Sequence, residues 1–146
     1  MNRLTQTTDP RGGTTQLAYD ANGNLLSLTD AASHATSYVY DDMDRVTSRT
    51  DPLTRAESYT YDANGNLTSV TDRKSQTTSL TYDALDRLTQ RTFQGGATIA
   101  YTWDAGNRLT QLVDSVAGTI TRTYDGLDRL LTETTPNGTV TYTYDA

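Results

Sequence analysis

Several common structural materials are missing from this chain, and each absence narrows its fold class. The sequence contains no cysteine, so neither disulfides nor thiolate metal sites hold the fold. Only one lysine and two glutamates occur, although arginine and aspartate are common. Since lysine and glutamate favour helices whereas aspartate favours turns, this imbalance argues against a helical protein. Abundant threonine and ten tyrosines instead favour β-structure.

Long apolar runs are also absent, and the chain is acidic overall. No stretch approaches membrane-spanning length, and the N-terminus lacks the apolar segment of a secretory signal. Hydrophobic residues make up 34% of the 146 residues, which is little for a compact core and favours a single sheet with one aromatic face. The net charge of −6 argues against nucleic acid or an anionic membrane as a partner, because both require a positive field.

What the sequence does contain is a 21-residue repeat, seen for example in Tyr61-Asp62-Ala63-Asn64-Gly65-Asn66-Leu67. In each repeat an aromatic residue is followed by Asp, and the motif ends on Leu or Val. The first five steps between successive anchors are 21 residues long and the last is 20. The predicted structural anchors are Tyr19, Asp20, Tyr40, Asp41, Tyr61, Asp62, Tyr82, Asp83, Trp103, Asp104, Tyr124, Asp125, Tyr144 and Asp145. A repeat of this length is one supersecondary unit, so it defines the architecture.

Each period divides into two short Thr-rich extended segments and two turns. Asn22-Gly23 and Asn64-Gly65 predict two-residue type I′ hairpins at the anchors. A second series of turns is predicted where Asp recurs eleven residues after an anchor or in the same phase, at Asp9, Asp30, Asp51, Asp72 and Asp114. The predicted fold is therefore all-β, an antiparallel hairpin meander of about seven repeats that forms a curved or spiralling, shell-like sheet.

Alternation along the strands predicts two unlike faces. Tyr59 and Tyr61 are two residues apart and share a face, whereas Thr60 between them lies on the other. The same spacing recurs in the other repeats, so we expect an aromatic stripe that forms the buried core and a polar opposite face. Repeats with Asn-Gly-Asn turns alternate with repeats in which an apolar residue precedes Asp-Arg. This suggests a 42-residue unit in which Met43, Leu85 and Leu127 fold back over the sheet edge.

The two ends of the sequence are parts of the same motif. Asn2-Arg3-Leu4 matches Asn107-Arg108-Leu109, and Tyr144-Asp145-Ala146 matches the beginning of an anchor. Since repeat arrays normally carry atypical capping units, we expect residues 1–146 to be a single array that is a segment of a longer one, or a unit whose ends pair with copies of itself.

Sites for metals, cofactors or catalysis are not predicted. Asp20 and the residues after it offer oxygens at alternate positions, but Leu25 and Ala31 occupy the positions where an EF-hand loop requires Gly and Glu. The Asp and Asn side chains are instead expected to cap turns. His34 is the only histidine and falls in a predicted loop without the partners of a catalytic triad. The chain is therefore expected not to be an enzyme.

The 21-residue period, the aromatic-Asp pair, the Asn-Gly-Asn-Leu or Asp-Arg-Leu continuation and the Asp-Pro turn resemble the YD repeat of Rhs proteins. Related repeats occur in insecticidal toxin-complex C components and in teneurins. The resemblance covers the whole chain and implies a long sheet that spirals into a hollow shell, which in bacterial members encloses a C-terminal toxin. Asp9-Pro10-Arg11-Gly12 is similar to the Asp-Pro pattern near the family's self-cleavage site, but its phase with Asp51-Pro52 favours an ordinary turn.

Three functions remain open at this point. The resemblance implies a segment of an Rhs-type shell that encloses or displays a toxin, in a secreted or cell-surface protein. Unpaired edge strands favour a self-assembling extracellular filament, whose partners would be flanking repeats or copies of the chain. The tyrosine stripe is also compatible with a carbohydrate-binding adhesin.

Overall fold

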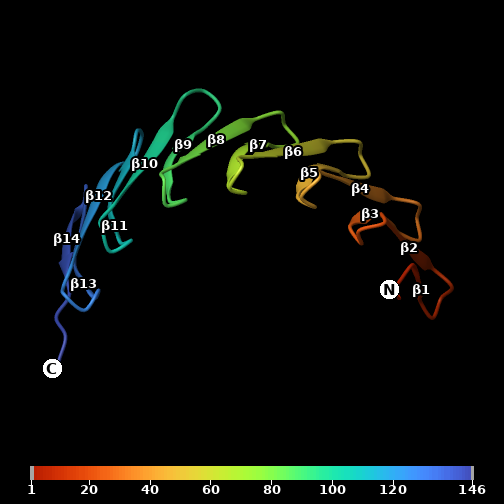
Figure 1. Ribbon diagram of the computed structural model, residues 1–146, viewed down its shortest axis with the longest axis horizontal. Helices are drawn as coiled ribbons and strands as arrows, with labels where there is room; N and C mark the ends of the chain where they lie inside the picture. Colours follow the sequence, from red (N-terminus) through yellow and green to blue (C-terminus); the bar gives the residue numbers. More distant parts are fainter. Residues whose placement is uncertain (1, 146) are drawn as a thin grey trace. The chain divides into compact units, whose positions relative to one another are not determined.

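The computed structural model describes residues 2–145, and all regular secondary structure in them is β-strand. Fourteen antiparallel strands follow one another in chain order in the sheet (Figure 1). They are β1 Gln6–Thr8, β2 Thr14–Tyr19, β3 Leu25–Thr29, β4 Ala35–Tyr40, β5 Val46–Thr50, β6 Ala56–Tyr61, β7 Leu67–Thr71, β8 Thr77–Tyr82, β9 Leu88–Thr92, β10 Thr98–Trp103, β11 Leu109–Asp114, β12 Gly118–Tyr124, β13 Leu130–Thr135 and β14 Gly138–Thr141. The predicted all-β antiparallel meander is confirmed.

The chain forms two compact units, each built from the same repeat. The first unit contains Met1–Asp62 and Ser69–Thr77, and the second contains Ala63–Thr68 and Thr78–Ala146. Within the first unit β2 pairs with β3 and β4 with β5, and within the second β10 pairs with β11 and β12 with β13. These four hairpins are closed by anchor turns, so the anchors define the same edge of the sheet within a unit.

A β-bulge beside the anchors keeps the apolar residues on the anchor face. Tyr19 is opposite Leu25, whereas Ala18 is opposite Ser27, so Leu26 is the extra residue of the bulge. Leu28 is then opposite Leu17, which shares a face with Tyr19. Without the bulge, Leu25 and Leu28 would point to opposite faces, because side chains alternate along a strand. The same register shift follows β4, β8, β10 and β12.

Burial alternates along the strands, but within the described residues no second layer covers either face. In β6 the side chains of Glu57, Tyr59 and Tyr61 are half-buried, whereas the residues between them are exposed. Among residues 2–145 only Leu80, at 8% exposure, and Asp51, at 5%, are buried, and neither is buried completely. The expectation that the aromatic stripe forms a buried core is therefore wrong for the chain by itself, because a single sheet half-covers its side chains.

The shortened last step of the repeat has a simple cause. Thr135 pairs with Gly138, so the turn between β13 and β14 has a two-residue loop. The corresponding turns earlier in the chain have three, as between Asp72 and Gln76, whose backbones are hydrogen-bonded across the loop at 2.9 Å. One residue fewer in this loop brings Tyr144 into its place 20 residues after Tyr124.

Candidate functional site

The anchor turns are three-residue loops that are closed by the anchor aspartate. In the first of them the Asp20 N–H donates to the Asn24 carbonyl at 3.0 Å and the Gly23 N–H donates to the Asp20 carbonyl at 3.3 Å. Only the third loop residue, Gly23, has a positive φ, of 106°. This is a type I turn followed by a left-handed residue, so the type I′ prediction is wrong at this turn.

The third loop position tolerates the left-handed backbone because of its residue type. Gly23 and Gly65 adopt it without a side-chain clash, at 106° and 94°. In the other anchor turns the position is taken by Asp or Asn, which visit this region more readily than other residues. Their φ values lie between 59° and 63°, for Asp44, Asp86, Asn107 and Asp128.

The anchor aspartate caps the turn through its side chain. The Asp104 carboxylate accepts hydrogen bonds from the N–H groups of Gly106 and Arg108, at 2.8 and 3.0 Å. These backbone donors, together with the Arg108 guanidinium, hold the pKa of Asp104 below its ordinary value. Most turns at the opposite edge use the same cap, for example Asp72 with Lys74 and Gln76, but Phe93 and Thr135 occupy this position in two of them. Aspartate therefore caps most turns at both edges.

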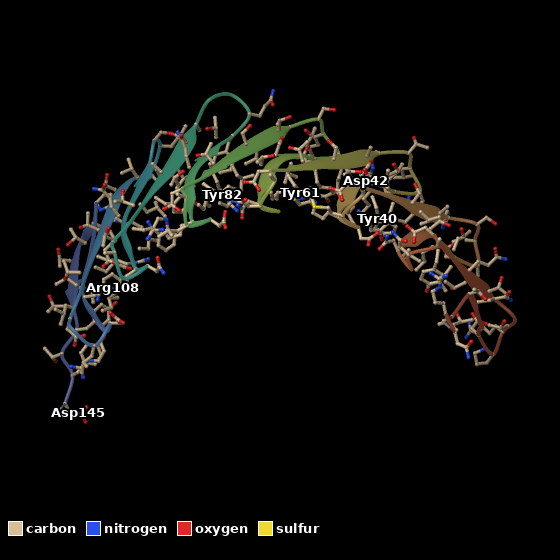
Figure 2. All side chains as sticks on the ribbon, in the orientation of Figure 1. Tyr40, Asp42, Tyr61, Tyr82, Arg108 and Asp145 are labelled. Atoms are coloured by element: carbon tan, nitrogen blue, oxygen red, sulfur yellow. The ribbon has the colours of Figure 1, made fainter. Side chains whose placement is uncertain are left out.

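Each aromatic anchor from Tyr40 onward hydrogen-bonds to the backbone of the preceding repeat. The Tyr61 hydroxyl donates to the Val46 carbonyl at 2.9 Å, and the Trp103 indole N–H donates to the Leu88 carbonyl at 2.8 Å. The acceptor is always the residue that begins the strand after the preceding anchor turn. The other members are Tyr40 to Leu25, Tyr82 to Leu67, Tyr124 to Leu109 and Tyr144 to Leu130. Tyr40, Tyr61 and Tyr82 are marked in Figure 2. The anchors therefore connect repeats as well as ending strands.

Arginine makes a second connection between successive repeats. Arg108 bonds backward to the Asp104 carboxylate at 2.7 Å and forward to the Asp125 carbonyl at 3.1 Å. Its guanidinium also lies 5.1 Å from the centre of the Tyr124 ring, within range of a cation–π contact. Figure 2 marks Arg108 in the second unit. Equivalent forward bonds join Arg3 to Asp20, Arg45 to Asp62 and Arg87 to Asp104.

The two alternating kinds of turn complement each other. Asn22 and Asn24 of one turn both donate through their side-chain amides to the Asp44 carboxylate of the next, at 2.9 and 2.5 Å. Asn64, Asn66 and Asp86 repeat this arrangement. The 42-residue alternation thus reflects bonding between turns. The predicted folding back of the apolar residues is wrong, because Met43, Leu85 and Leu127 are 58%, 65% and 74% exposed.

A cluster of ion pairs in the first unit interrupts the row of apolar side chains on the anchor face. Arg73 bonds to Glu57 at 2.7 Å and to Asp51 at 3.3 Å, and Arg49 bonds to Glu57 at 3.3 Å. Asp51 also forms an ion pair with Arg55 at 2.6 Å. The Arg55 side chain is the largest cause that lowers the pKa of Asp51 to about 2. Because each of these charges faces an opposite charge, the cluster stabilises the sheet more readily than it binds an ion.

Other candidate sites gain little support. His34 lies in an exposed turn and contacts Asp30 at 3.0 Å. Within residues 2–145 no group of three or more His, Asp or Glu side chains is placed to hold a metal ion. That same part of the chain contains no helix long and apolar enough to cross a membrane.

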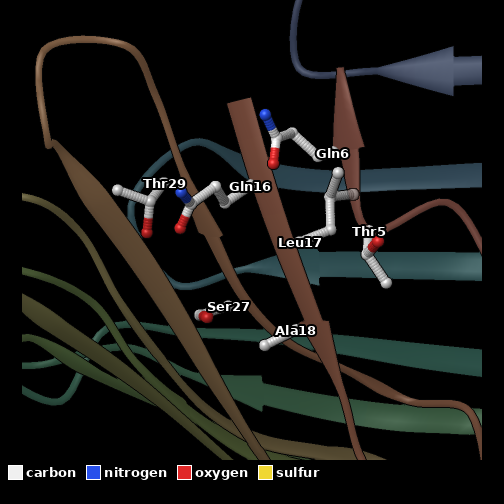
Figure 3. A pocket seen from close by; sticks show the side chains of 7 residues that line it. All are labelled: Thr5, Gln6, Gln16, Leu17, Ala18, Ser27 and Thr29. Atoms are coloured by element: carbon white, nitrogen blue, oxygen red, sulfur yellow. The ribbon is translucent and has the colours of Figure 1, made fainter. Parts of the chain in front are cut away.

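A depression of about 370 Å³ lies across β1, β2 and β3, where Gln16 and Thr29 are opposite each other (Figure 3). Its lining is mostly small polar side chains, and it carries no charged group.

The structure places the sequence-predicted anchors in equivalent positions. Six aromatic anchors make the hydrogen bond to the preceding repeat, whereas Tyr19 faces the Arg3 guanidinium at 5.4 Å. Asp145 is exposed and makes no ion pair or side-chain hydrogen bond within residues 2–145 (Figure 2). The reach of the turn arginines to the next repeat was not predicted from the sequence. The signal available was the fixed spacing of 17 residues between Arg108 and Asp125.

Comparisons with known proteins agree with this geometry. A family model described as RHS Repeat matches residues 2–33, 19–56, 61–96, 82–120 and 124–146. No curated protein matches the chain. The crystal structure of a TcdB2–TccC3–Cdc42 complex is 21% identical over 91% of this chain and 9% of that chain, with a TM-score of 0.75. A Tc holotoxin pore from Photorhabdus luminescens is 22% identical over 84% of this chain and 7% of that chain, with a TM-score of 0.69. The chain thus spans less than a tenth of these neighbours.

Proposed function

The chain belongs to the RHS repeat family, and from this premise we propose that residues 1–146 are one stretch of a longer, non-enzymatic scaffold that encloses or displays a toxin. The observation that carries the scaffold role is the ladder between repeats. Six anchor side chains donate to the backbone of the preceding repeat, and four arginines donate to the turn that follows. The most regular side chains of the sequence are thereby used to hold the array together.

The neighbouring structures support the longer array and its cargo. The chain spans 9% of the chain in one TcdB2–TccC3 structure, so that fold continues far beyond the part that resembles residues 1–146. Another of these structures is TcdB2–TccC3 without its hypervariable C-terminal region, so a variable C-terminal region is a property of that protein. We extend it to this chain as a proposal: a variable domain would follow the array and be held by it, in a protein that acts outside the producing cell.

Sequencing the coding region on both sides of residues 1–146 tests the shell. The expected result is a long further array of the same repeat, followed by an unrelated C-terminal domain. In the encoded full-length protein that domain should resist added protease until the sheet is denatured. If the C-terminal domain is digested as fast in the full-length protein as in isolation, the array does not enclose it. Display of the toxin would then be the form of the proposal that remains. A coding region without further repeats would overturn the shell.

A filament is the second candidate, and the open edges of the sheet favour it. β1 and β14 are the outermost strands of the sheet order, and an unpaired edge strand recruits another chain. Sedimentation of the purified chain separates this function from the first, because ordered long polymers form only in the filament.

A carbohydrate-binding role is less well supported, because arginine side chains already cover the rings of aromatic anchors. Arg45 lies 4.6 Å from the centre of the Tyr61 ring, and Arg108 lies 5.1 Å from that of Tyr124. A guanidinium over the ring occupies the surface on which a sugar would stack. The carbohydrate-binding role would gain support if the chain bound a glycan and if Tyr61→Ala abolished this binding while the variant stayed folded.

A further inference from the structure

Three Asn-Gly pairs occur in the sequence, and each of them lies at a turn. They are Asn22-Gly23, Asn64-Gly65 and Asn137-Gly138. An asparagine before glycine is chemically labile, because glycine has no side chain to hinder the attack of its backbone nitrogen on the asparagine side-chain amide. In a folded chain the reaction depends on what holds that amide and that nitrogen.

The first pair is held at both of its reacting groups. The Asn22 side-chain amide donates to the Asp44 carboxylate at 2.9 Å, and the Gly23 N–H donates to the Asp20 carboxylate at 2.8 Å. Hydrogen bonds to a carboxylate are stronger than those between neutral groups. Attack of the Gly23 nitrogen on the Asn22 amide therefore requires both bonds to open first.

The third pair lacks both of these restraints. Asn137 and Gly138 are exposed, and the Asn137 side chain makes no hydrogen bond within residues 2–145. Thr135 takes the place of the capping aspartate, and its hydroxyl accepts from the Asn137 N–H at 3.2 Å. A Cβ built at Gly138 would meet no atom within 4 Å, so the space around the pair is open. The Asn137 amide is thus free to turn toward the Gly138 nitrogen.

We propose that Asn137 is a modification site, at which the folded chain deamidates through a cyclic imide. The Gly138 nitrogen loses its proton to solvent base and bonds to the side-chain amide carbon of Asn137. The side-chain nitrogen takes a proton from the solvent and leaves as ammonia. Water then adds to one of the two imide carbonyls and opens the ring, which leaves either aspartate or isoaspartate at position 137.

This modification would alter the turn between β13 and β14. Thr135 is paired with Gly138, so the turn has a loop of only two residues. Isoaspartate runs the backbone through the former side-chain carbon and adds one atom to this short loop, which works against the pairing of Thr135 with Gly138. The turn lies at the ends of β13 and β14, so repeats alongside β14 in a longer array would leave it accessible. The inference is independent of the scaffold role, because it concerns one turn of the folded chain.

Peptide mapping by mass spectrometry tests the site. The folded chain is incubated in mildly alkaline heavy-oxygen water and sampled over time. Asn137 should gain one heavy oxygen roughly tenfold faster or more than Asn22 and Asn64, because hydrogen bonds to carboxylates must open at those two positions. In concentrated urea the three rates should become similar, since each asparagine then precedes glycine in an unfolded chain. Equal rates in the folded chain, an unmodified Asn137, or the same preference in urea would overturn the proposal.

Asp44→Gly tests the protection of Asn22. Glycine fits the left-handed third loop position, as Gly23 does with a φ of 106°, but it removes the carboxylate that holds the Asn22 amide. Deamidation of Asn22 should become several-fold faster. Asn64 is the control in the same molecule, because its amide stays bonded to Asp86 at 2.9 Å. An unchanged rate at Asn22 would show that these hydrogen bonds do not select the site.

Asn137→Gln is the matched variant, because glutamine keeps the amide but would have to close a larger ring. Native isoelectric focusing should show an acidic form that accumulates in the unmodified chain and not in this variant. In the aged chain, hydrogen exchange of β14 should be faster than in the aged variant. Equal accumulation of the acidic form in both chains would place the modification elsewhere and overturn the proposal.

Discussion

Aspartate is the residue that the fold uses most systematically. The anchor aspartates from Asp41 to Asp125 that have a perturbed pKa all have it lowered, and arginine and backbone N–H donors are the leading causes. A carboxyl whose pKa is lower in the folded than in the unfolded chain stabilises the fold when it is ionised. Acid should therefore weaken both series of turns together.

Asp51 gives the sharpest test of this pH dependence. Its pKa falls from 3.8 to about 2, so its ionic contribution is complete above about pH 4 and is lost as the pH falls toward 2. The difference in unfolding free energy between the unmodified chain and Asp51→Asn should shrink across this interval. Urea denaturation at a series of pH values measures it. Other carboxyls titrate in both proteins and cancel in the difference.

Asp42 supplies the matched control for that series. It is exposed and makes no ion pair or side-chain hydrogen bond in the described part of the chain (Figure 2). Asp42→Asn should leave the stability difference near zero at every pH. A difference for Asp51→Asn that stays constant between pH 4 and pH 2 would contradict an ionic role of Asp51.

The anchor hydrogen bond is tested by removing one hydroxyl. Tyr61→Phe keeps the ring under Arg45 but loses the bond to the Val46 carbonyl, which should cost about 1 kcal/mol of unfolding free energy. Tyr142→Phe is the control, because the Tyr142 hydroxyl makes no side-chain hydrogen bond within the described residues. Urea denaturation should show less than about 0.5 kcal/mol for it. Equal effects of the two substitutions would remove the anchor role.

At the scale of single turns and strands, sequence placed the elements but not their local geometry. Asn64-Gly65 correctly marked a chain reversal, and Asp51-Pro52 marked another. The type I′ assignment failed because an Asn-Gly pair also fits a type I turn in which Gly alone has a positive φ, and the Asp20 cap favours that form. Nothing in alternation by two predicts a bulge. The spacing of Leu25 and Leu28 by three was the signal that could have revealed it.

One turn residue is strained and offers a stabilising change. Thr54 has a φ of 62°, a region that disfavours a β-branched residue by roughly 1–2 kcal/mol. Thr54→Gly should raise the unfolding free energy by about 0.5 kcal/mol, the strain relieved minus the greater unfolded-chain entropy of glycine. Thr119→Gly, at an extended position in β12, should lower it by about 1 kcal/mol. Two changes of the same sign would show that the left-handed backbone of Thr54 carries no strain.

At the scale of the whole molecule, the family and the fold class could be predicted from the sequence. The fixed 21-residue period indicates the fold class, and the repeated motif indicates the family. Burial could not, since it depends on what covers the sheet. Leu80, at 8% exposure, is the only buried apolar residue among positions 2–145. The pairing of Arg with the following repeat was also missed, because it joins residues 17 apart that no local rule connects. Stability must therefore come from contacts between neighbouring strands.

A substitution in one repeat should destabilise mainly the strands next to it. In the second unit β12 contacts β11 and β13, so removing Tyr124 disturbs its bond to Leu109 and the stacking of Arg108 on its ring. Native-state hydrogen exchange of Tyr124→Ala should show amides of β11–β13 exchanging about tenfold faster or more, with β9 little changed, as in other one-dimensional repeat proteins. Leu127→Ala is the control, because that side chain is 74% exposed. Equal acceleration from β9 to β13 would mean that the strands open as one cooperative unit and that the ladder between repeats is not a sum of neighbour contacts.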